Sequence, residues 1–421
     1  MSVDLVVIGL GYVGLPLAAE ATRSGLQVRG YDISATVVAS LNAGESHVDD
    51  IADSEVDRMR SVGFTATTDE DVLDGADVVV VCVPTPLAPS GGPDLSAVNA
   101  ALATVTRHLH RGQLVVLEST TYPGTTDEIA RPLLEATGLH VGTDVHLAFS
   151  PERIDPGNAK FGVQNTPKVV GGCTPECTRA AVSFYERFID TVIAAKGTRE
   201  AEMSKLLENT YRHVNIALVN ELARFCHELQ IDIWDVIRLA SSKPFGFQPF
   251  YPGPGVGGHC IPVDPLYLAY KVRTDLGEPS RFIELAQSIN SGMPEYVVAR
   301  CADLLNRNGK SLRGVKVLLL GVTYKRDISD TRETPALDLA LALQDAGARV
   351  SYHDPHIPRW HVPGIGNLVC VPDLDDALRG CDLAVLVQNH REYDGEQLAS
   401  TGTLLFDTRG VLTSSGGVEL L

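Results

Sequence analysis

The chain has 421 residues, which is too long for one ordinary hydrophobic core and suits two or three domains. Its hydrophobic content of 44% and charged content of 21% are ordinary for a soluble globular protein. The net charge of -18 argues against a nucleic-acid partner, which requires a basic face, whereas an anionic small ligand needs only a local Lys, Arg or helix N-terminus.

No apolar run is long enough to span a membrane. The first residues run directly into a predicted strand without a basic region or cleavage site, so we expect no signal peptide. The eight cysteines are scattered along the chain, which fits a reducing cytoplasm and not a disulfide framework. Cys173 and Cys177 are spaced C-x3-C, but no second pair or nearby histidine completes a metal site. We therefore interpret them as structural and predict no metal.

The first third of the chain opens with a buried parallel strand, residues 3–8, that is rich in β-branched side chains. Gly9, Gly11 and Gly14 follow in the pattern G-x-G-x-x-G and lead into a predicted helix, and the next strand ends at Asp32. Glycines in this context allow a pyrophosphate to approach a helix N-terminus, and the acid accepts hydrogen bonds from a ribose. The alternative is a coincidental turn. Because Asp32 also repels a 2′-phosphate, the pattern favours NAD over NADP.

Three further predicted strands of this region end in polar residues. The segments 77–86, 113–126 and 145–158 bring Thr85, Thr120 and Glu152 to strand ends. Ligands gather outside the carboxyl ends of the strands in an open parallel sheet, so we expect the three side chains to face one crevice. For Glu152 the alternative is a surface acid that pairs with Arg153 or with solvent.

A long helix is predicted from about residue 199, and Lys205, Asn209 and Arg212 form one stripe on it. A solvated polar face is the default interpretation of such a stripe. Asn is a modest helix former, however, and the stripe shares its segment with a glycine-rich loop that contains Cys260.

The glycine-rich loop runs from Pro252 to Pro265 and places four glycines before Cys260. Glycine runs occur where the backbone turns sharply or touches a ligand closely, so the cysteine is a candidate nucleophile. The alternative is a small buried residue, which is the usual fate of a free cysteine. His259 is not favoured as the base of the thiol, because adjacent side chains of an extended backbone point to opposite sides.

The last third repeats the strand–loop–helix pattern and predicts a second doubly wound domain. The loop after its first strand, 315–320, contains Lys325, Arg326 and Arg332, which suit phosphate groups. These cations can equally pair with the acids of the same loop, and the spacing does not decide between the two.

An NAD domain supplies hydride transfer, and a cysteine in the same crevice permits a second oxidation. Its thiolate adds to an aldehyde, the thiohemiacetal loses a hydride, and water releases a carboxylate from the thioester. These steps need a base for the alcohol, a stabiliser for the oxyanion and a base for the water. Lys205, Asn209 and Asp264 suit the first two roles, and Glu152 suits the third.

The motifs together resemble those of the nucleotide-sugar 6-dehydrogenases, which include UDP-glucose, GDP-mannose and UDP-N-acetylhexosamine dehydrogenases. The likeness covers essentially the whole chain. It comprises GLGYVGLPLA at the start, VPTP at 83–86, EST-x-YPGTT at 118–126, SPER at 150–153, SKLLEN at 204–209, GPGVGGHCIPVDP at 253–265 and YKRDISDTRETPA at 324–336.

The resemblance implies an α/β fold with two Rossmann-like doubly wound domains joined by a long central helical region. We expect an NAD-binding domain at 1–195, a helical dimerisation region with the cysteine loop at 196–300, and a UDP-binding domain at 301–421. The implied reaction is a two-fold oxidation at C6 of the sugar to a uronic acid, with two NAD+ per turnover. The expected partners are a UDP-sugar and a second copy of the chain in a homodimer, without nucleic acid or membrane.

Roles for individual residues also follow from the resemblance. It makes Cys260 the nucleophile and Lys205, beside Asn209, an acid/base or oxyanion-stabilising group. Asp264 orders water or acts as base in the alcohol step, and Thr120 and Glu152 position and activate water. The implied cofactor contacts are Gly9, Gly11, Tyr12, Val13, Gly14, Asp32, Pro84, Thr85, Thr120 and Arg332. The implied substrate contacts are Glu152, Arg153, Lys205, Asn209, Arg212, Phe250, Tyr251, Gly257 and Lys325.

The choice of sugar depends on the cysteine loop. UDP-glucose enzymes tend to have a Cys-Phe-Pro-Lys-Asp type loop, whereas this chain has His-Cys-Ile-Pro-Val-Asp at 259–264. The loop resembles the UDP-N-acetylglucosamine and UDP-N-acetylmannosamine branch, with UDP-N-acetylglucosamine favoured and polysaccharide biosynthesis as the expected setting. UDP-glucose or another nucleotide sugar is an alternative substrate.

Two further interpretations come from other functional classes. A single-step NAD-dependent dehydrogenase of the 3-hydroxyacid type shares the opening fold but has no need of Cys260. A non-catalytic NAD- and nucleotide-binding regulator has no need of the set formed by Lys205, Asn209, Cys260 and Asp264.

Overall fold

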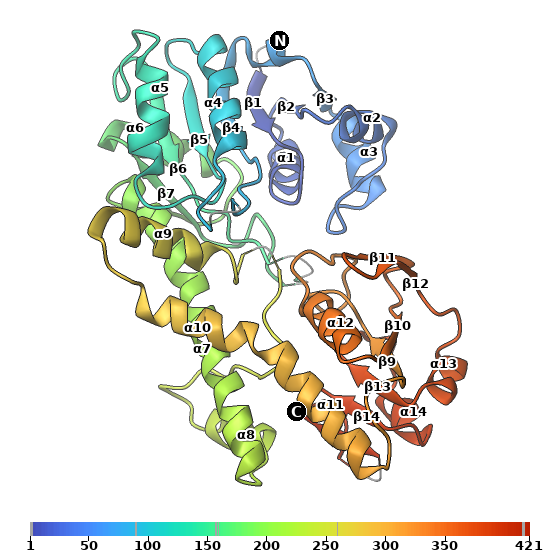
Figure 1. Cartoon of the computed structure of the whole chain (residues 1–421). Helices are drawn as coiled ribbons and strands as arrows, with labels where there is room; N and C mark the ends of the chain where they lie inside the picture. The colour runs from blue at the N-terminus through green and yellow to red at the C-terminus, as the bar shows by residue number, and fades with distance from the viewer. Residues whose placement is uncertain (1–2, 89–90, 156–157, 159, 259, 415–416) are drawn as a thin grey trace. The chain divides into compact units, whose positions relative to one another are not determined.

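The computed structural model describes residues 3–88, 91–155, 158, 160–258, 260–414 and 417–421 (Figure 1). The chain divides into two compact units, Met1–Glu208 with Leu266–Glu278, and Asn209–Pro265 with Pro279–Leu421. No helix among the described residues is both long and apolar enough to cross a membrane. The predicted α/β fold with two Rossmann-like sheets and a long central helix is confirmed.

The first unit is built on an eight-stranded sheet in the order β3-β2-β1-β4-β5-β6-β7-β8. Only the β6–β7 pair among its pairings is antiparallel. The strands are β1 (Val3–Ile8), β2 (Val28–Tyr31), β3 (Thr65–Thr67), β4 (Ala76–Val81), β5 (Leu114–Leu117), β6 (His146–Phe149), β7 (Lys168–Gly172) and β8 (Val192–Ala194). Because chain order reverses between β1 and β4, their carboxyl ends form the topological switch point where a ligand binds in this kind of sheet.

Helices pack on both faces of this sheet, because its central strands are apolar on both sides. Leu5 and Val7 join one core with α1, α3 and α6, whereas Val6 and Ile8 join a second core with α4 and α5. The helices of the first unit are α1 (Gly14–Arg23), α2 (Ala35–Ala43), α3 (Asp53–Ser61), η1 (Glu70–Leu73), α4 (Ser96–His108), η2 (Thr126–Ala130), α5 (Arg131–Glu135) and α6 (Pro175–Tyr185).

Two helices contribute residues to both units. The 31-residue α7 (Thr198–Glu228) starts in the first unit and ends in the second, and α9 (Asp264–Leu276) starts in the second and ends in the first. In the second unit, α8 (Ile233–Ser241) packs on α7 through a small apolar cluster that includes Val219 and Ile237.

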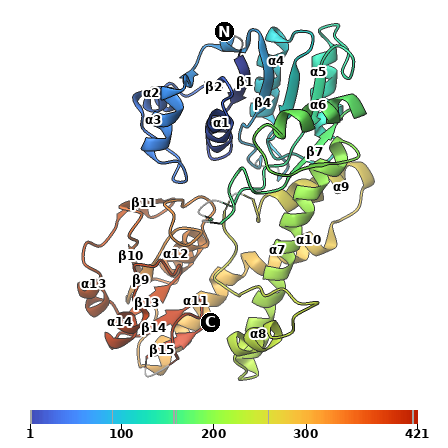
Figure 2. The ribbon, with the colours of Figure 1, turned by 180° about the vertical axis from the view of Figure 1, so that it is seen from behind.

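The second unit contains a five-stranded parallel sheet in the order β10-β9-β13-β14-β15, whose last strands are seen from behind in Figure 2. Its elements are α10 (Arg281–Ser291), α11 (Met293–Arg307), β9 (Lys316–Leu320), α12 (Pro335–Asp345), β10 (Arg349–His353), α13 (Leu374–Gly380), β13 (Leu383–Leu386), α14 (Gly395–Ser400), β14 (Leu405–Asp407) and β15 (Val418–Leu420). A separate hairpin pairs β11 (Arg359–Val362) with β12 (Gly366–Val369). Val317 and Leu319 face α11 and α12, whereas Leu318 and Leu320 face α13 and α14.

The helical segment 280–305 forms two helices, α10 and α11, which are separated at Gly292. Gly292 is the C-cap of α10, and Pro294 occupies the first turn of α11, where its missing N–H costs nothing. Continuing α10 through Pro294 would lose a backbone hydrogen bond and create a clash with the preceding turn.

Candidate active site

The glycine turn between β1 and α1 has the geometry of a dinucleotide cradle. Gly9 has φ of +89°, and a Cβ there would lie 2.7 Å from the carbonyl oxygen of Cys82. A Cβ on Gly14 would lie 1.9 Å from the carbonyl oxygen of Gly9. A Cβ on Gly11, in contrast, would meet no atom within 4 Å, so the chain leaves room there for a ligand to approach the backbone. The turn fits a bound pyrophosphate.

Asp32 follows β2 and is tied to this turn. One carboxylate oxygen accepts the N–H of Leu10 at 2.9 Å, and the other accepts the N–H of Ser34 at 2.8 Å. Each oxygen has a further lone pair, so the carboxylate can still accept from ribose hydroxyls. Tyr12 and Val13 lie half-buried in the same turn.

Polar residues end β4 and β5, as predicted. Thr85 is buried, Pro84 beside it is exposed, and the carbonyl oxygen of Thr85 accepts a short hydrogen bond from the hydroxyl of Tyr267 on α9. Thr120 is half-buried after β5, and its hydroxyl oxygen accepts a hydrogen bond from Lys205 Nζ at 2.5 Å. The structure therefore brings Thr120 and Lys205, residues of two separate motifs, into direct contact.

Glu202, one turn before Lys205 on α7, fixes the loop after β5. Its carboxylate accepts the N–H of Gly124 at 2.6 Å, the N–H of Thr126 at 2.9 Å and the hydroxyl of Thr126 at 2.7 Å. Glu202 is 1% exposed, and burial outweighs these hydrogen bonds to raise its pKa from 4.5 to about 7. The role of Glu202 has no local signal in the sequence, because it depends on a loop that lies 76 residues away in the chain.

Glu152 lies after β6 with its carboxylate directed partly to its own backbone. Oε1 accepts the N–H groups of Arg153 at 2.7 Å and Ile154 at 2.5 Å, and Oε2 lies 3.7 Å from Nζ of Lys168. The side chain of Arg153 pairs with Glu208 at 2.7 Å instead of with Glu152. The surface ion pair considered from sequence is thus not the one that forms.

In the second unit, Asn209 and Asp264 form a buried pair. Nδ2 of Asn209 donates to Oδ2 of Asp264 at 2.6 Å, and the two residues are 9% and 1% exposed. The N–H of Asp264 donates to the carbonyl oxygen of Cys260 at 2.9 Å, which links the cysteine loop to the first turn of α9. All eight cysteines are described and reduced, and Cys260 is the exposed one among them. His259 lies outside the described residues.

A chain of hydrogen bonds through two buried asparagine side chains anchors the cysteine loop to α7 and α10. The N–H of Gly253 donates to Asn220 at 2.9 Å, Asn220 donates to Asn290 at 2.9 Å, and Asn290 donates to the carbonyl oxygen of His213 at 3.2 Å. His213 follows Asn209 by one turn on α7, so the buried polar stripe runs through Asn209 and His213, while Arg212 is exposed. The sequence suggested that a solvated face was the default, but tertiary packing buries most of this stripe.

Close packing accounts for two glycines of this loop. A Cβ on Gly257 would lie 2.6 Å from the carbonyl oxygen of Glu333, and one on Gly258 would lie 2.8 Å from the ring of Tyr324. Gly258 also has φ of +87°. Nearby, Phe250 packs its ring against Tyr211 at 5.6 Å, and the exposed Tyr251 stacks on Trp234 at 6.4 Å.

A polar cavity of about 130 Å³ lies behind this loop in the second unit. Its walls include Gly255, Pro262, Asn290 and Thr334, together with the buried ring of His213. Burial lowers the pKa of His213 to about 4, so this ring is neutral at physiological pH.

The loop after β9 carries the cations predicted to meet phosphates. Lys325 is half-buried, and the exposed Arg332 forms a bidentate pair with Asp330, at 2.6 Å for the shortest contact. A further cation, Arg409 in the loop after β14, was not predicted from sequence. Arg409 donates to the carbonyl oxygen of Val387 at 2.7 Å, pairs with no carboxylate in the described chain, and would meet a Cβ on Gly253 at 3.1 Å.

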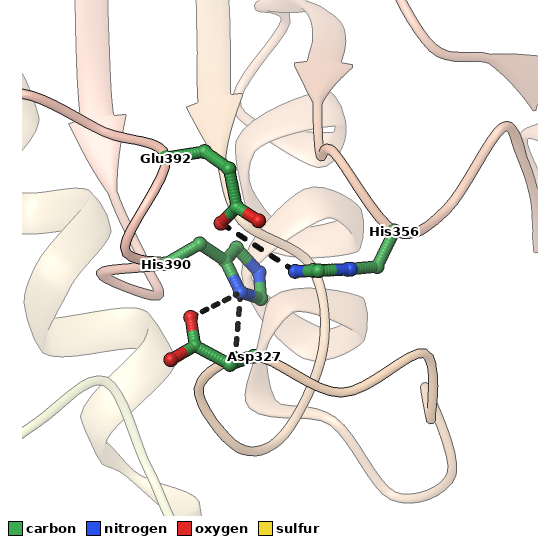
Figure 3. Close-up of side chains that lie close together, drawn as sticks. All are labelled: Asp327, His356, His390 and Glu392. Atoms are coloured by element: carbon green, nitrogen blue, oxygen red, sulfur yellow. Dashed lines mark hydrogen bonds and ion pairs between the residues drawn. The ribbon is translucent and has the colours of Figure 1, made fainter. Parts of the chain in front are cut away.

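Figure 3 shows a second polar cluster, Asp327, His356, His390 and Glu392, drawn from the carboxyl ends of β9, β10 and β13. The two nitrogens of His390 are engaged, Nδ1 by the N–H of Asp327 at 3.0 Å and Nε2 by Asp354 at 3.1 Å. The carboxylate of Asp327 accepts from both the backbone and the guanidinium of Arg391. Nε2 of His356 lies 3.6 Å from the carboxylate of Glu392 and makes no hydrogen bond among the described residues. Because His390 and Asp327 are engaged by neighbouring loops, we interpret the cluster as a network that fixes these loops.

The structure thus assembles two partial sites. The first unit brings together the glycine turn, Asp32, Thr120 and Lys205, and the second brings together Asn209, Asp264 and Cys260. The dinucleotide cradle of the first unit indicates an NAD-dependent oxidoreductase.

Comparison with known proteins identifies the family. Models of the UDP-glucose/GDP-mannose dehydrogenase family match the chain at 3–189 (NAD binding domain), 199–292 (central domain) and 318–414 (UDP binding domain). The chain belongs to this family and is an NAD-dependent dehydrogenase of nucleotide sugars.

Its relatives include the UDP-N-acetyl-D-mannosamine dehydrogenase of Pyrococcus horikoshii, 34% identical over 418 residues that cover 97% of this chain and 96% of the relative. The solved structure of the UDP-D-ManNAc dehydrogenase from Pyrococcus horikoshii superposes with a TM-score of 0.90 at 32% identity, covering 99% of this chain and 98% of that one. The UDP-N-acetyl-mannosamine dehydrogenase from Staphylococcus aureus gives a TM-score of 0.85 at 32% identity, with coverage of 99% and 97%.

Proposed function

We propose that this enzyme oxidises the C6 hydroxymethyl group of UDP-N-acetyl-D-mannosamine to a carboxylate through a thioester on Cys260. The exposed Cys260 carries this proposal, because a second oxidation needs a thiol that substrate can reach. The names of the similar proteins favour mannosamine over the glucosamine isomer that we favoured from sequence. UDP-N-acetylglucosamine and UDP-glucose remain the alternative substrates.

The chemistry divides among the residues described above. When bound, NAD+ accepts one hydride in each of the two oxidations. A base removes the proton of the C6 hydroxyl, and we assign this role to Asp264, which acts through an ordered water molecule. Lys205 and Asn209 stabilise the oxyanion that develops as the C6 carbon changes geometry. The Cys260 sulfur adds to the aldehyde carbon and gives up its proton, and the second hydride loss leaves a thioester.

Hydrolysis then regenerates the thiol. Glu152 takes a proton from water, the water oxygen bonds to the thioester carbon, and the carbon–sulfur bond breaks. The products are a carboxylate and the Cys260 thiolate, which takes up a proton. Thr120, in contact with Lys205, orients the water.

Binding of UDP is supported by the cations of the second unit. Lys325 and Arg409 lie in loops that follow β9 and β14, and a diphosphate is a suitable partner for them. We assign Arg332 to binding of the NAD phosphates. In this role its guanidinium leaves the ion pair with Asp330 and pairs with a phosphate instead.

We further propose that the enzyme is a homodimer in the cytoplasm. Leu218, Leu222 and Phe225 form an apolar stripe on α7 that continues to Leu229 just after the helix, with exposures of 51%, 39%, 53% and 68%. A second copy of the chain is the natural occupant of this face in view of the family resemblance, and the reduced cysteines suit the cytoplasm. Phe225→Glu should convert the dimer to monomer in sedimentation velocity; an unchanged mass would exclude this face.

The substrate is tested by a screen of UDP-N-acetylmannosamine, UDP-N-acetylglucosamine, UDP-glucose and GDP-mannose with NAD+. We expect the highest kcat/KM with UDP-N-acetylmannosamine and two NADH for each sugar consumed. A ratio of one NADH per sugar would overturn the thioester route. The matched variant Cys260→Ser should bind both ligands in calorimetry but release no uronate, and full turnover by it would exclude the nucleophile.

A further inference from the structure

A buried charge cluster lies behind Glu152 in the first unit. Lys168, the first residue of β7, is 6% exposed, and its Nζ lies 3.0 Å from Oε1 of Glu118 and 3.7 Å from Oε2 of Glu152. Glu118 follows β5 and is 1% exposed. One ammonium group therefore serves two carboxylates.

Glu118 is only partly satisfied. The hydroxyl of Tyr185 and the ammonium of Lys168 both donate to its Oε1, while its buried Oε2 has no hydrogen-bond partner among the described residues. Burial raises the pKa of Glu118, the ammonium of Lys168 opposes this rise, and the charge of Glu152 adds to it. The ammonium of Lys168 also lies 5.0 Å from the centre of the Tyr185 ring.

A purely structural ion pair would need only Lys168 and one acid. The second acid changes the electrostatics, because the cluster carries one excess negative charge when both carboxylates are ionised. That excess disappears when Glu152 accepts a proton, which is the event required during thioester hydrolysis. Lys168 opposes the same protonation, so the two neighbours act on Glu152 in opposite directions.

We propose that Lys168 and Glu118 are positioning residues that set the basicity of Glu152 for thioester hydrolysis. Lys168 orients the carboxylate of Glu152, and Glu118 places a second carboxylate against the same ammonium. This inference rests on the proposed function, in which Glu152 is the base for water. The groups that face Glu152 are Lys168 on β7, Glu118 after β5, Cys82 after β4 and Arg153 beside it, which pairs with Glu208 on α7. Tyr185 on α6 reaches the cluster through Glu118.

Two single variants should shift the pH dependence in opposite directions. Lys168→Met removes the cation and leaves two carboxylates. The pH below which the rate of thioester hydrolysis falls, here called the acid limb, should therefore rise by roughly one to three units. Glu118→Gln removes one negative charge while keeping the shape, so the limb should move to lower pH. A structural role predicts lower stability for both variants without opposite shifts.

A double variant protects the test against misfolding. Lys168→Met alone leaves Glu118 buried without its cation, which is strongly destabilising. Glu118→Gln with Lys168→Met removes both charges together and should shift the limb by less than Lys168→Met alone. Arg300→Met is the control for loss of a buried cation, because Arg300 is 3% exposed and pairs with Glu419 in the second unit. This control should lose stability but keep the wild-type profile.

The measurement is the decay of the acyl adduct on Cys260. The full enzyme is mixed with UDP-N-acetylmannosamine and NAD+, quenched at intervals between pH 5.5 and 9, and analysed by denaturing mass spectrometry. Opposite shifts with a smaller shift in the double variant are expected. Unchanged profiles in all three variants, or normal decay in Glu152→Gln, would overturn the inference. If the wild-type enzyme forms no adduct on Cys260, the proposed function itself fails.

Discussion

The buried carboxyl of Glu202 makes a quantitative prediction about stability. Its pKa is raised from 4.5 to about 7 by burial, so between these values the folded chain holds a proton that the unfolded chain releases. The stabilisation from this proton is fully present below pH 4.5 and is lost as the pH rises through 7. At about 1.4 kcal/mol per pKa unit, the loss is about 3 kcal/mol in total, of which about 2 kcal/mol falls between pH 5.5 and 8.

Glu202→Gln isolates this contribution, because the amide is neutral at every pH. The variant loses part of the hydrogen bonding to Gly124 and Thr126, which adds an offset that does not depend on pH. The free energy of unfolding of the wild type, relative to that of the variant, should therefore fall by about 2 kcal/mol from pH 5.5 to 8. Glu128→Gln is the matched control, because its carboxylate is 42% exposed in the same region.

Urea unfolding followed by circular dichroism measures the free energies. Tryptophan fluorescence would report only on the second unit, because both tryptophans, Trp234 and Trp360, lie there. Hydrogen exchange in β4 and β5 therefore assigns the unfolding transition to the first unit. A difference between wild type and Glu202→Gln that stays constant or rises with pH would refute the reasoning. It would mean that the three hydrogen bonds outweigh burial and keep the carboxylate ionised.

Three further predictions concern binding and catalysis. Asp32→Asn should lower the preference for NAD+ over NADP+ at least tenfold in kcat/KM ratios, since the charge that repels a 2′-phosphate is gone; an unchanged ratio would remove Asp32 from cofactor selection. Asn209→Ala should cost about 1.5–3 kcal/mol in unfolding free energy, because Asp264 loses a buried donor at 2.6 Å, and chemical denaturation measures this. Gly14→Ala should abolish NAD+ binding in calorimetry, since its Cβ would lie 1.9 Å from the carbonyl oxygen of Gly9; normal affinity would show that the turn can relax.

The sequence predicted the architecture and the identity of the main motifs. Residues 3–8 with the glycine turn and Asp32 predicted a strand, a cradle and a second strand, and the structure has β1, the turn and β2 at these places. Such segments are predictable because apolar β-branched runs and glycine spacing are local properties. The antiparallel placement of β7 and the hairpin of β11 and β12 were not predicted, since short strands depend on their partners.

The partners of the site residues were decided by tertiary structure. The sequence placed Lys205 and Asn209 on one stripe of a helix, but it did not indicate that Thr120 accepts from Lys205 or that Asp264 accepts from Asn209. Those contacts join residues 85 and 55 positions apart, and burial turns a surface stripe into a set of paired polar groups.

The nature of Cys260 was therefore fixed in two stages. The sequence alone determined that a cysteine follows a glycine run in an NAD-binding chain, because residue types and local spacing suffice for that conclusion. Only the tertiary structure decided that this thiol is exposed while Glu118, Lys168 and Glu202 are buried. Exposure and burial depend on which distant segments pack together, and they set the charge and hydrogen bonding of each group.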